Sequence, residues 1–275
     1  MCDYDLLVCG GGSAGYAAAR TAALGGLRVG LAEMLGELGG ALTAGCVYYV
    51  MDAAPETKIL RDVRGCFAAA GGAKPGYYMV DGEKLRLYLE QSLLEAGVDL
   101  RYFTKVCGAK TENGRILSVT AADRSGLREI TARAFADCTG EGDLAFFAGA
   151  GYDYGGPEGE LQPMSFEVIV TGLDPELVKP FAGNPGGIRN PDGWKNLLAE
   201  LRRAGMEPTY LRPLLHDMGD GIYNFNVNHQ YLRGCDAGEL TRATAEGRRE
   251  TFEAVERLRS LGGSGRISRW SAPHP

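Results

Sequence analysis

The hydrophobic positions at the start of the chain predict a compact βαβ unit. Residues 6–9 and 27–32 are continuous apolar runs without polar alternation, which is typical of strands buried on both faces of a parallel sheet. The alanine-rich residues 14–23 between them predict a helix that packs closely on such a sheet. Gly25 and Gly26 supply the end of that helix.

The next hundred residues predict a second helix and a set of short strands. A stripe of apolar positions follows Asp81, an expected N-cap, and ends at Gly97, so residues 81–97 predict an amphipathic helix. A strand is expected at residues 98–102. Three turn-linked segments predict an antiparallel meander, and they are followed by an apolar strand, a Thr-Gly turn and a helix over residues 142–148. The meander segments are residues 105–110, 115–122 and 129–133.

From residue 152 the pattern changes, and we place a domain boundary there. Residues 1–151 are expected to bind a nucleotide, residues 152–262 to form a partial substrate or cap region, and residues 263–275 to be a tail. The periodicity predicts further elements along the chain, and the pattern is least regular in the helix over residues 57–70. These are helices over residues 57–70, 194–203 and 240–261 and strands over residues 165–171 and 223–228.

The glycine spacing between the first strand and the first helix predicts a dinucleotide site. Gly10 permits a tight turn, Gly12 lets a pyrophosphate approach the backbone, and Gly15 lets the helix pack close to the strand. The start of the helix adds free N–H groups and a partial positive charge. A lone glycine motif is weak in a chain with 41 glycines, but its position between a strand and a helix makes it specific.

An acid at the end of the second strand completes this motif. Glu33 lies 18 residues after Gly15, close to where a carboxylate would hold the hydroxyls of an adenosine ribose. The acid would repel a 2′-phosphate, and Met34 and Leu35 supply no arginine, so NADP is disfavoured. NAD and FAD share the adenosine diphosphate, and the motif leaves both open.

Composition narrows the classes of partner. The net charge of −6 disfavours nucleic acid and anionic membranes, and no apolar run reaches transmembrane length. The chain starts without the pattern of a secretory signal, and its seven cysteines include no Cys-x-x-Cys, which favours a reducing cytoplasm. The three histidines have no metal-ligand spacing. We therefore expect a cytoplasmic protein that acts on a small molecule, without a metal and without a membrane or nucleic-acid partner.

The order of these motifs resembles the FAD-binding fold of glutathione-reductase-like flavoproteins. Within that fold, the chain is most similar to the broad group of FAD-dependent oxidoreductases, over residues 3 to about 261. The widely shared motifs are "CGGGSAG", "LGGALTAG" and "DCTGEGDLAFFAGA", whereas "LQPMSFEVIVTGLD" and "RGCDAGELTRATAEGR" are typical of the narrower group. The resemblance implies an α/β fold: a Rossmann-like FAD-binding domain with a central parallel sheet and a crossover β-meander, joined to a partial α+β substrate region.

The resemblance also implies which residues contact FAD. Its pyrophosphate would lie on the glycine turn, its adenosine ribose on Glu33 with Met34 beside it, and its adenine on the backbone of Val106. Asp143 is either a group that bonds the backbone at the start of its helix or, more simply, an acid that complements the helix N-terminus. The remaining implied contacts are Gly10, Gly12, Ser13, Ala14 and Gly15 at the pyrophosphate, Gly39, Gly40 and Ala41 towards the flavin, and Thr139 and Gly140 at the adenosine end.

No residue of the sequence is assigned as catalytic. Flavin disulfide reductases carry two cysteines after their Gly-Gly loop, whereas here Cys46 stands alone, so dithiol activity is not expected. Cys46 is more simply a small packed hydrophobe. His229 could donate a proton, although a structural histidine is the simpler interpretation, and Tyr223 and Asn226 are equally open.

Members of this group continue beyond the equivalent of residue 261 with a section that returns to the first domain, and nothing in "GGSGRISRWSAPHP" resembles it. We therefore expect a C-terminally truncated chain. The predicted function is FAD-dependent oxidation or reduction of a small molecule by hydride transfer. Two alternatives stay open: a catalytically inactive, truncated nucleotide-binding fragment, and an NAD-dependent dehydrogenase.

Overall fold

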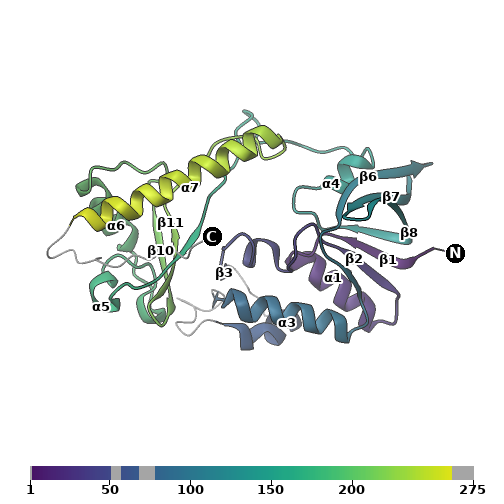
Figure 1. Ribbon diagram of the computed structural model, residues 1–275, viewed down its shortest axis with the longest axis horizontal. Coiled ribbons are helices and arrows are strands. Elements are labelled where there is room, and N and C mark those ends of the chain that lie inside the picture. Colours follow the sequence, from purple (N-terminus) through teal and green to yellow (C-terminus); the bar gives the residue numbers. More distant parts are fainter. Residues whose placement is uncertain (1, 51–56, 68–77, 262–275) are drawn as a thin grey trace. The chain divides into compact units, whose positions relative to one another are not determined.

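A computed structural model describes residues 2–50, 57–67 and 78–261 (Figure 1). The chain divides into two compact units, each with its own sheet and helices. Unit 1 comprises Met1–Ala44 and Gly82–Asp153, and unit 2 comprises Gly45–Asp81 and Tyr154–Pro275. Residues 45–81 thus belong to the second unit, which a single boundary near residue 152 does not anticipate. The assignment of residues 1–151 to the cofactor and of residues 152–262 to the substrate stays a prediction.

Unit 1 is built on a six-stranded mixed sheet with the strand order β5-β2-β1-β8-β7-β6. Strands β5, β2, β1 and β8 are parallel, and β7 and β6 continue the sheet in antiparallel pairing. The parallel βαβ core and the meander predicted from the sequence are confirmed. The strands are β1 (Tyr4–Cys9), β2 (Val29–Ala32), β5 (Asp99–Arg101), β6 (Lys105–Glu112), β7 (Arg115–Asp123) and β8 (Gly126–Asp137).

One long strand joins the meander to the parallel sheet. Residues 126–131 of β8 pair antiparallel with β7, and residues 132–137 of the same strand pair parallel with β1. The sequence analysis separated a third meander strand from a returning apolar strand, and this division was wrong. Residues 126–129 of β8 are exposed, Ile130 and Ala132 are buried, and the residues after Ala132 are exposed or half-buried, so burial does not mark a boundary between the two halves.

Helices and an apolar cluster complete unit 1. Helices α1 (Ser13–Leu24) and α3 (Gly82–Glu95) pack together, and the Tyr16 hydroxyl is 2.9 Å from the Ser92 hydroxyl. Helix α4 (Asp143–Phe147) places Leu144 in a core shared with Val119 of the meander and Leu7 of β1. A short 3₁₀ turn, η1 (Gly40–Leu42), follows β2. These contacts hold the loops after β1, β2 and β8 on a rigid base.

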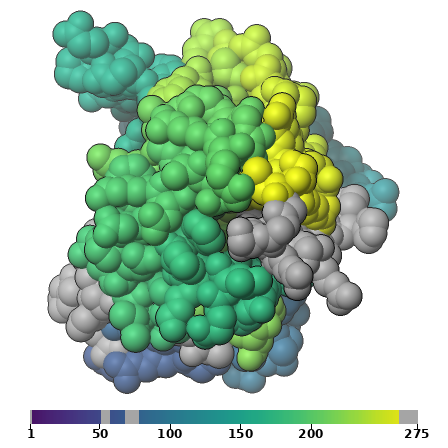
Figure 2. All heavy atoms as spheres, turned by 90° about the vertical axis from the view of Figure 1, so that its left-hand side faces the viewer, coloured from purple at the N-terminus to yellow at the C-terminus, as the bar shows by residue number. Residues whose placement is uncertain are grey.

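Unit 2 contains a three-stranded antiparallel sheet in the order β10-β11-β9. Alternate residues of β11, among them Tyr223 and Phe225, are buried in a core shared with the long helices α6 and α7. One side of α7 stays at the surface of the unit, visible in yellow in Figure 2. The elements of this sheet and its helices are β9 (Val168–Val170), β10 (Leu214–Gly219), β11 (Ile222–Asn226), α5 (Pro175–Val178), α6 (Gly193–Arg203) and α7 (Ala237–Ser260).

The segment that runs through residues 45–81 adds small elements to unit 2. Its described parts contain β3 (Tyr49–Val50) paired with β4 (Tyr78–Met79), together with α2 (Lys58–Asp62) and η2 (Val63–Cys66). A further 3₁₀ turn, η3 (Pro185–Gly187), precedes α6. The helix expected over residues 57–70 is thus a short α-helix that tightens into a 3₁₀ turn, and its last residues, from 68, lie outside the described part.

The long, strongly periodic elements of unit 2 were predicted well. Helices α6 and α7 and strands β9 and β11 are confirmed within a few residues. Strand β10 was missed because "LLHDMG" mixes apolar and polar residues without a clear alternation. In the described part of the chain, no helix is long and apolar enough to cross a membrane.

Candidate functional site

Two glycines of the turn after β1 are required by close backbone packing. Gly10 has φ of 101°, and a Cβ there would lie 2.2 Å from the carbonyl oxygen of Cys138. A Cβ on Gly15 would lie 1.9 Å from the carbonyl oxygen of Gly10. Both distances are far below van der Waals contact, so any other residue would push α1 away from the strands. The sequence analysis assigned these two glycines to a tight turn and to helix packing, which the geometry supports.

Gly12 is different, because a Cβ added there would meet no atom within 4 Å. It is the N-cap residue of α1, with φ of −64°, and no side chain caps this helix end. Ser13 and Ala14 of the first turn are exposed. The backbone N–H groups of this turn are therefore presented beside an open space, which suits a phosphate group.

The Gly-Gly loop lies directly against this turn. The N–H of Gly39 donates to the carbonyl oxygen of Gly11 at 2.9 Å, and Gly39 forms an isolated parallel bridge with Gly12. A Cβ on Gly40 would lie 3.1 Å from the Cα of Gly12. Ala41 follows in η1 with its side chain exposed. The tertiary structure thus brings together two glycine loops about 28 residues apart in sequence.

Glu33 is buried beneath the glycine turn, with only 7% of its surface exposed. The N–H of Gly11 donates to its Oε2 at 2.6 Å, and the N–H of Leu35 donates to its Oε1 at 2.7 Å. These two bonds orient the carboxylate and leave lone pairs on both oxygens for further donors. Met34, in contrast, is more than half exposed, so its side chain does not contribute to the core of the unit.

The start of the meander is tied to Glu33 through the backbone. The N–H of Thr104 donates to the carbonyl oxygen of Glu33 at 2.9 Å. Two residues later, Val106 buries its side chain in the core of unit 1, and the β6–β7 register shifts between Val106 and Gly108. Because the side chain is buried, it is not available to a ligand, and the expected backbone contact of Val106 with adenine stays a prediction.

The loop after β8 ends beside the same turn. The N–H of Cys138 donates to the carbonyl oxygen of Cys9 at 2.8 Å, and Gly140 follows with φ of 89°. The Thr139 hydroxyl donates to Asp137 at 2.7 Å and accepts the N–H of Asp143 at 2.8 Å. The Thr139 hydroxyl thus satisfies the first N–H of α4, whose N-cap residue is Gly142. Asp143 lies in the first turn of α4, where an acid complements the helix dipole.

These loops all follow the carboxyl ends of parallel strands, which is the edge where open α/β sheets bind ligands. Gly10 and Gly12 follow β1, Glu33 follows β2, and Thr139 follows β8. Gly39 bridges Gly12 directly, Glu33 lies against Gly11, and Thr139 lies against Gly10. The residues present thus fit the pyrophosphate and adenosine ribose of a dinucleotide, and the individual contacts stay predictions.

Unit 2 carries a separate group of polar side chains on its small sheet. Asn224 and Asn226 point to the face of β11 opposite the core residues Tyr223 and Phe225. Asn226 donates to Glu167 at 2.9 Å, and Asn224 bonds the carbonyl oxygen of Cys46 at 2.8 Å. In the described part of the chain, the Oδ1 atom of Asn226 is buried without a hydrogen-bond partner, so an acceptor is available there.

His216 extends this group on the neighbouring strand. It stands opposite Asn224 in the β10–β11 register and stacks on Tyr49, with ring centroids 4.6 Å apart. Burial lowers the pKa of His216 to about 4, although a hydrogen bond with Asn224 acts to raise it. The imidazole is therefore neutral at pH 7. Burial raises the pKa of Glu167, although hydrogen bonds from Asn224 and Asn226 oppose the shift.

The other residues that the sequence analysis considered for chemistry are packed or stacked against neighbouring side chains. Tyr223 is 2% exposed in the unit 2 core. His229 stacks on Tyr210 with centroids 3.7 Å apart, and burial lowers its pKa. Cys46 is a free, partly buried thiol whose sulfur lies 3.8 Å from the Tyr48 hydroxyl. The sequence analysis missed His216 and Glu167, since His216 lies on the unpredicted β10.

The described residues hold no group of three or more side chains arranged to bind a metal ion.

Comparison with known proteins supplies the family. The model of the FAD-dependent oxidoreductase family matches residues 5–263. The chain therefore belongs to the FAD-dependent oxidoreductases. A thiamine thiazole synthase of Aeropyrum pernix is 34% identical over 117 residues, which cover 42% of each chain.

Solved structures share the fold. A geranylgeranyl bacteriochlorophyll reductase-like protein of Thermoplasma acidophilum matches 98% of this chain and 64% of its own, with a TM-score of 0.61 and 16% identity. The p-nitrophenol 4-monooxygenase PnpA of Pseudomonas putida matches 98% and 66%, with a TM-score of 0.57 and 12% identity. The present chain thus spans about two thirds of the length of these structures and less than half of the thiazole synthase.

Proposed function

We propose that unit 1 binds FAD and that the protein uses it to oxidise or reduce a small molecule by hydride transfer. The observation that carries this proposal is the open space at Gly12, the N-cap residue of α1 that bridges Gly39, with the carboxylate of Glu33 oriented by the N–H of Gly11. Membership of the FAD-dependent oxidoreductase family supports FAD over NAD as the dinucleotide.

In this proposal each loop has one task. The N–H groups at the start of α1, from Gly12 to Gly15, hold the pyrophosphate, and Gly39 to Ala41 line the path towards the flavin. Glu33 accepts hydrogen bonds from the ribose hydroxyls, with Met34 alongside. The backbone of Val106 meets the adenine, and Thr139 and Gly140 close the adenosine end.

FAD would supply the electron-pair acceptor or donor of the reaction, and the chain would bind and orient both partners. The polar face of unit 2 supports a role in handling the substrate. Glu167, with its raised pKa, holds a proton more readily than an exposed carboxyl, and the buried Oδ1 atom of Asn226 has a free lone pair for a donor. Such groups orient a polar substrate or exchange a proton with it.

The test is the visible absorption spectrum of the chain purified in the presence of FAD, followed by reduction with dithionite. We expect flavin bands that co-elute with the protein, bleach on reduction and are weaker in the Gly12→Ala variant. A colourless protein that binds ADP would overturn the redox function for this chain and leave nucleotide binding alone. A colourless protein that reduces NAD with a substrate would replace the proposal with the dehydrogenase alternative.

A further inference from the structure

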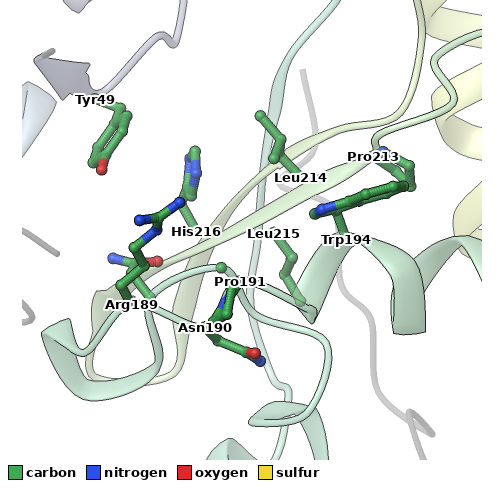
Figure 3. A pocket seen from close by; sticks show the side chains of 11 residues that line it. Tyr49, Arg189, Asn190, Pro191, Trp194, Pro213, Leu214, Leu215 and His216 are labelled. Atoms are coloured by element: carbon green, nitrogen blue, oxygen red, sulfur yellow. The ribbon is translucent and has the colours of Figure 1, made fainter.

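A cavity of about 290 Å³ opens in unit 2, beside the polar face of the small sheet (Figure 3). Its walls come from the loop before α6, the first residues of α6, strand β10 and Tyr49. The volume is at the small end of the range for ligand sites in proteins, which is enough for a compound of one or two rings.

Flat rings line this cavity on two sides. Tyr49 and His216 are stacked with an interplanar angle of 30°, and Trp194 stands across from them, next to Leu214 (Figure 3). His216 is neutral at pH 7, so this pair is an aromatic surface and not a cation. Rings of this kind favour a planar ligand, because offset stacking and burial of its faces both contribute to binding.

The charge in the cavity has one sign. Arg189 extends towards Tyr49 and His216 (Figure 3), and in the described part of the chain no carboxylate forms an ion pair with it. The described lining contains no Asp or Glu. Outside the lining, the guanidinium of Arg212 lies 5.5 Å from the centre of the Trp194 ring and adds positive charge near the cavity wall. An arginine without an acidic partner beside aromatic walls is suited to a carboxylate.

Hydrogen bonds to Asp217 of β10 hold the loop that carries Arg189 in place. The side chain of Asn184 donates to the carbonyl oxygen of Asp217 at 3.0 Å and accepts its N–H at 2.8 Å. The carboxylate of Asp217 is itself occupied by the N–H groups of Gly186 and Gly219, each at 2.8 Å. The loop is therefore fixed on β10, and the nearby acid is engaged by the backbone, so the cavity is formed before a ligand arrives.

We propose that this cavity binds a planar aromatic carboxylate, with the ring against Trp194 and the Tyr49–His216 pair and the carboxylate on Arg189. The proposal concerns ligand recognition by unit 2 and does not depend on the redox function proposed for the protein. It names the chemical class of ligand, one or two fused rings with an acid group.

The experiment is a calorimetric titration of the full chain with 2-naphthoate and with its uncharged analogue 2-naphthamide. We expect the acid to bind about tenfold more tightly than the amide, because the amide has one neutral acceptor oxygen in place of a charged carboxylate that can bond arginine through both oxygens. The Arg189→Gln variant should bind the acid as weakly as the amide. Arg203→Gln, which removes the same charge from the exposed end of α6, should keep the preference.

A second variant tests the aromatic wall. Trp194→Leu should weaken acid and amide by similar factors and leave their ratio unchanged, since it removes the stacking surface and keeps Arg189. Circular dichroism melting of each variant checks that it folds. Equal binding of acid and amide to the unaltered chain, absence of binding up to the solubility limit, or an unchanged preference in Arg189→Gln would each overturn the proposal. None of these readouts depends on FAD, so the two proposals can fail separately.

Discussion

The N–H of Gly11 donates to Oε2 of Glu33 at 2.6 Å, so the acid that is proposed to hold the ribose is also bonded to the glycine turn that is proposed to hold the pyrophosphate. A second backbone donor, Leu35, occupies the other carboxylate oxygen at 2.7 Å. The pairing links the ends of β1 and β2 and sets the direction in which the acid points. Loss of either acceptor is therefore expected to affect both the fold and the binding of a nucleotide.

Replacement of Glu33 by Gln should weaken ADP binding at least about tenfold. Glutamine has one acceptor oxygen, so its amide group must face either Gly11 or Leu35, donor against donor. We also expect a loss of about 1–3 kcal/mol in the free energy of unfolding. Isothermal titration with ADP and urea denaturation measure the two effects. Glu112→Gln, at an exposed position of β6, is the matched control, and unchanged ADP affinity in Glu33→Gln would remove this residue from the site.

Alanine at Gly12 and alanine at Gly15 should have opposite consequences. Gly15→Ala brings a Cβ to 1.9 Å from the Gly10 carbonyl oxygen, a backbone atom that cannot rotate away, and should destabilise the protein by about 2–3 kcal/mol or more. Gly12→Ala has free space and an ordinary φ, so the unfolding free energy should change by less than about 1 kcal/mol.

Nucleotide affinity is the second property in which the Gly12→Ala variant should change. The methyl group of Gly12→Ala occupies the space proposed for the pyrophosphate, so ADP and FAD affinity should fall about tenfold or more while the fold is kept. Thermal melting and ADP titration of the same samples provide both readings. A Gly12→Ala protein that melts normally and binds ADP with unaltered affinity would show that the phosphates lie elsewhere.

Unit 2 should lose stability in acid through His216. Its pKa is about 4 in the folded chain, below the ordinary value of 6.5, because burial disfavours the charged imidazole. The stabilising contribution is therefore fully present above the unfolded-state pKa and is lost as the pH falls through about 4. Over this window the contribution amounts to about 3 kcal/mol at most.

Urea denaturation at about pH 7 and pH 4, followed by tryptophan fluorescence, measures this loss. The His216→Gln variant keeps a polar side chain opposite Asn224 but has no imidazole to protonate, so its unfolding free energy should fall less than that of the unaltered chain. Equal acid sensitivity of the two proteins would contradict the assignment.

The seven thiols should differ in reactivity according to burial. Cys107 and Cys235 are exposed and should react quickly with a disulfide reagent in the native protein. Burial, with smaller contributions from Asp137 and Cys138, raises the pKa of Cys9 to about 12, so Cys9 should stay unreactive until the chain unfolds. Stopped-flow labelling with and without denaturant counts the two classes. The Cys107→Ser variant should lack one fast-reacting thiol, and rapid labelling of Cys9 would refute the burial of β1.

The sequence by itself determined the parts of this protein that rest on local pattern. The glycine spacing, the apolar runs and Glu33 predicted the βαβ unit and the edge that is proposed to bind a nucleotide, since a tight turn and a closely packed helix impose residue types within about 30 positions. The meander and the long helices followed from turn residues and periodicity. These elements are found where the sequence predicted them because each is stabilised by its own amphipathic or buried pattern.

Only the tertiary structure decided the relationships between distant segments. Gly39 packs on Gly12, residues 45–81 belong to unit 2, and Tyr49, Arg189 and His216 line one cavity. Each of these relationships joins residues that are far apart in the sequence, where hydrophobic periodicity gives no information. Strand β8 shows the same limit, because its two halves pair with different neighbours. Such contacts depend on which surfaces meet when the chain folds, and a local pattern of residues does not record them.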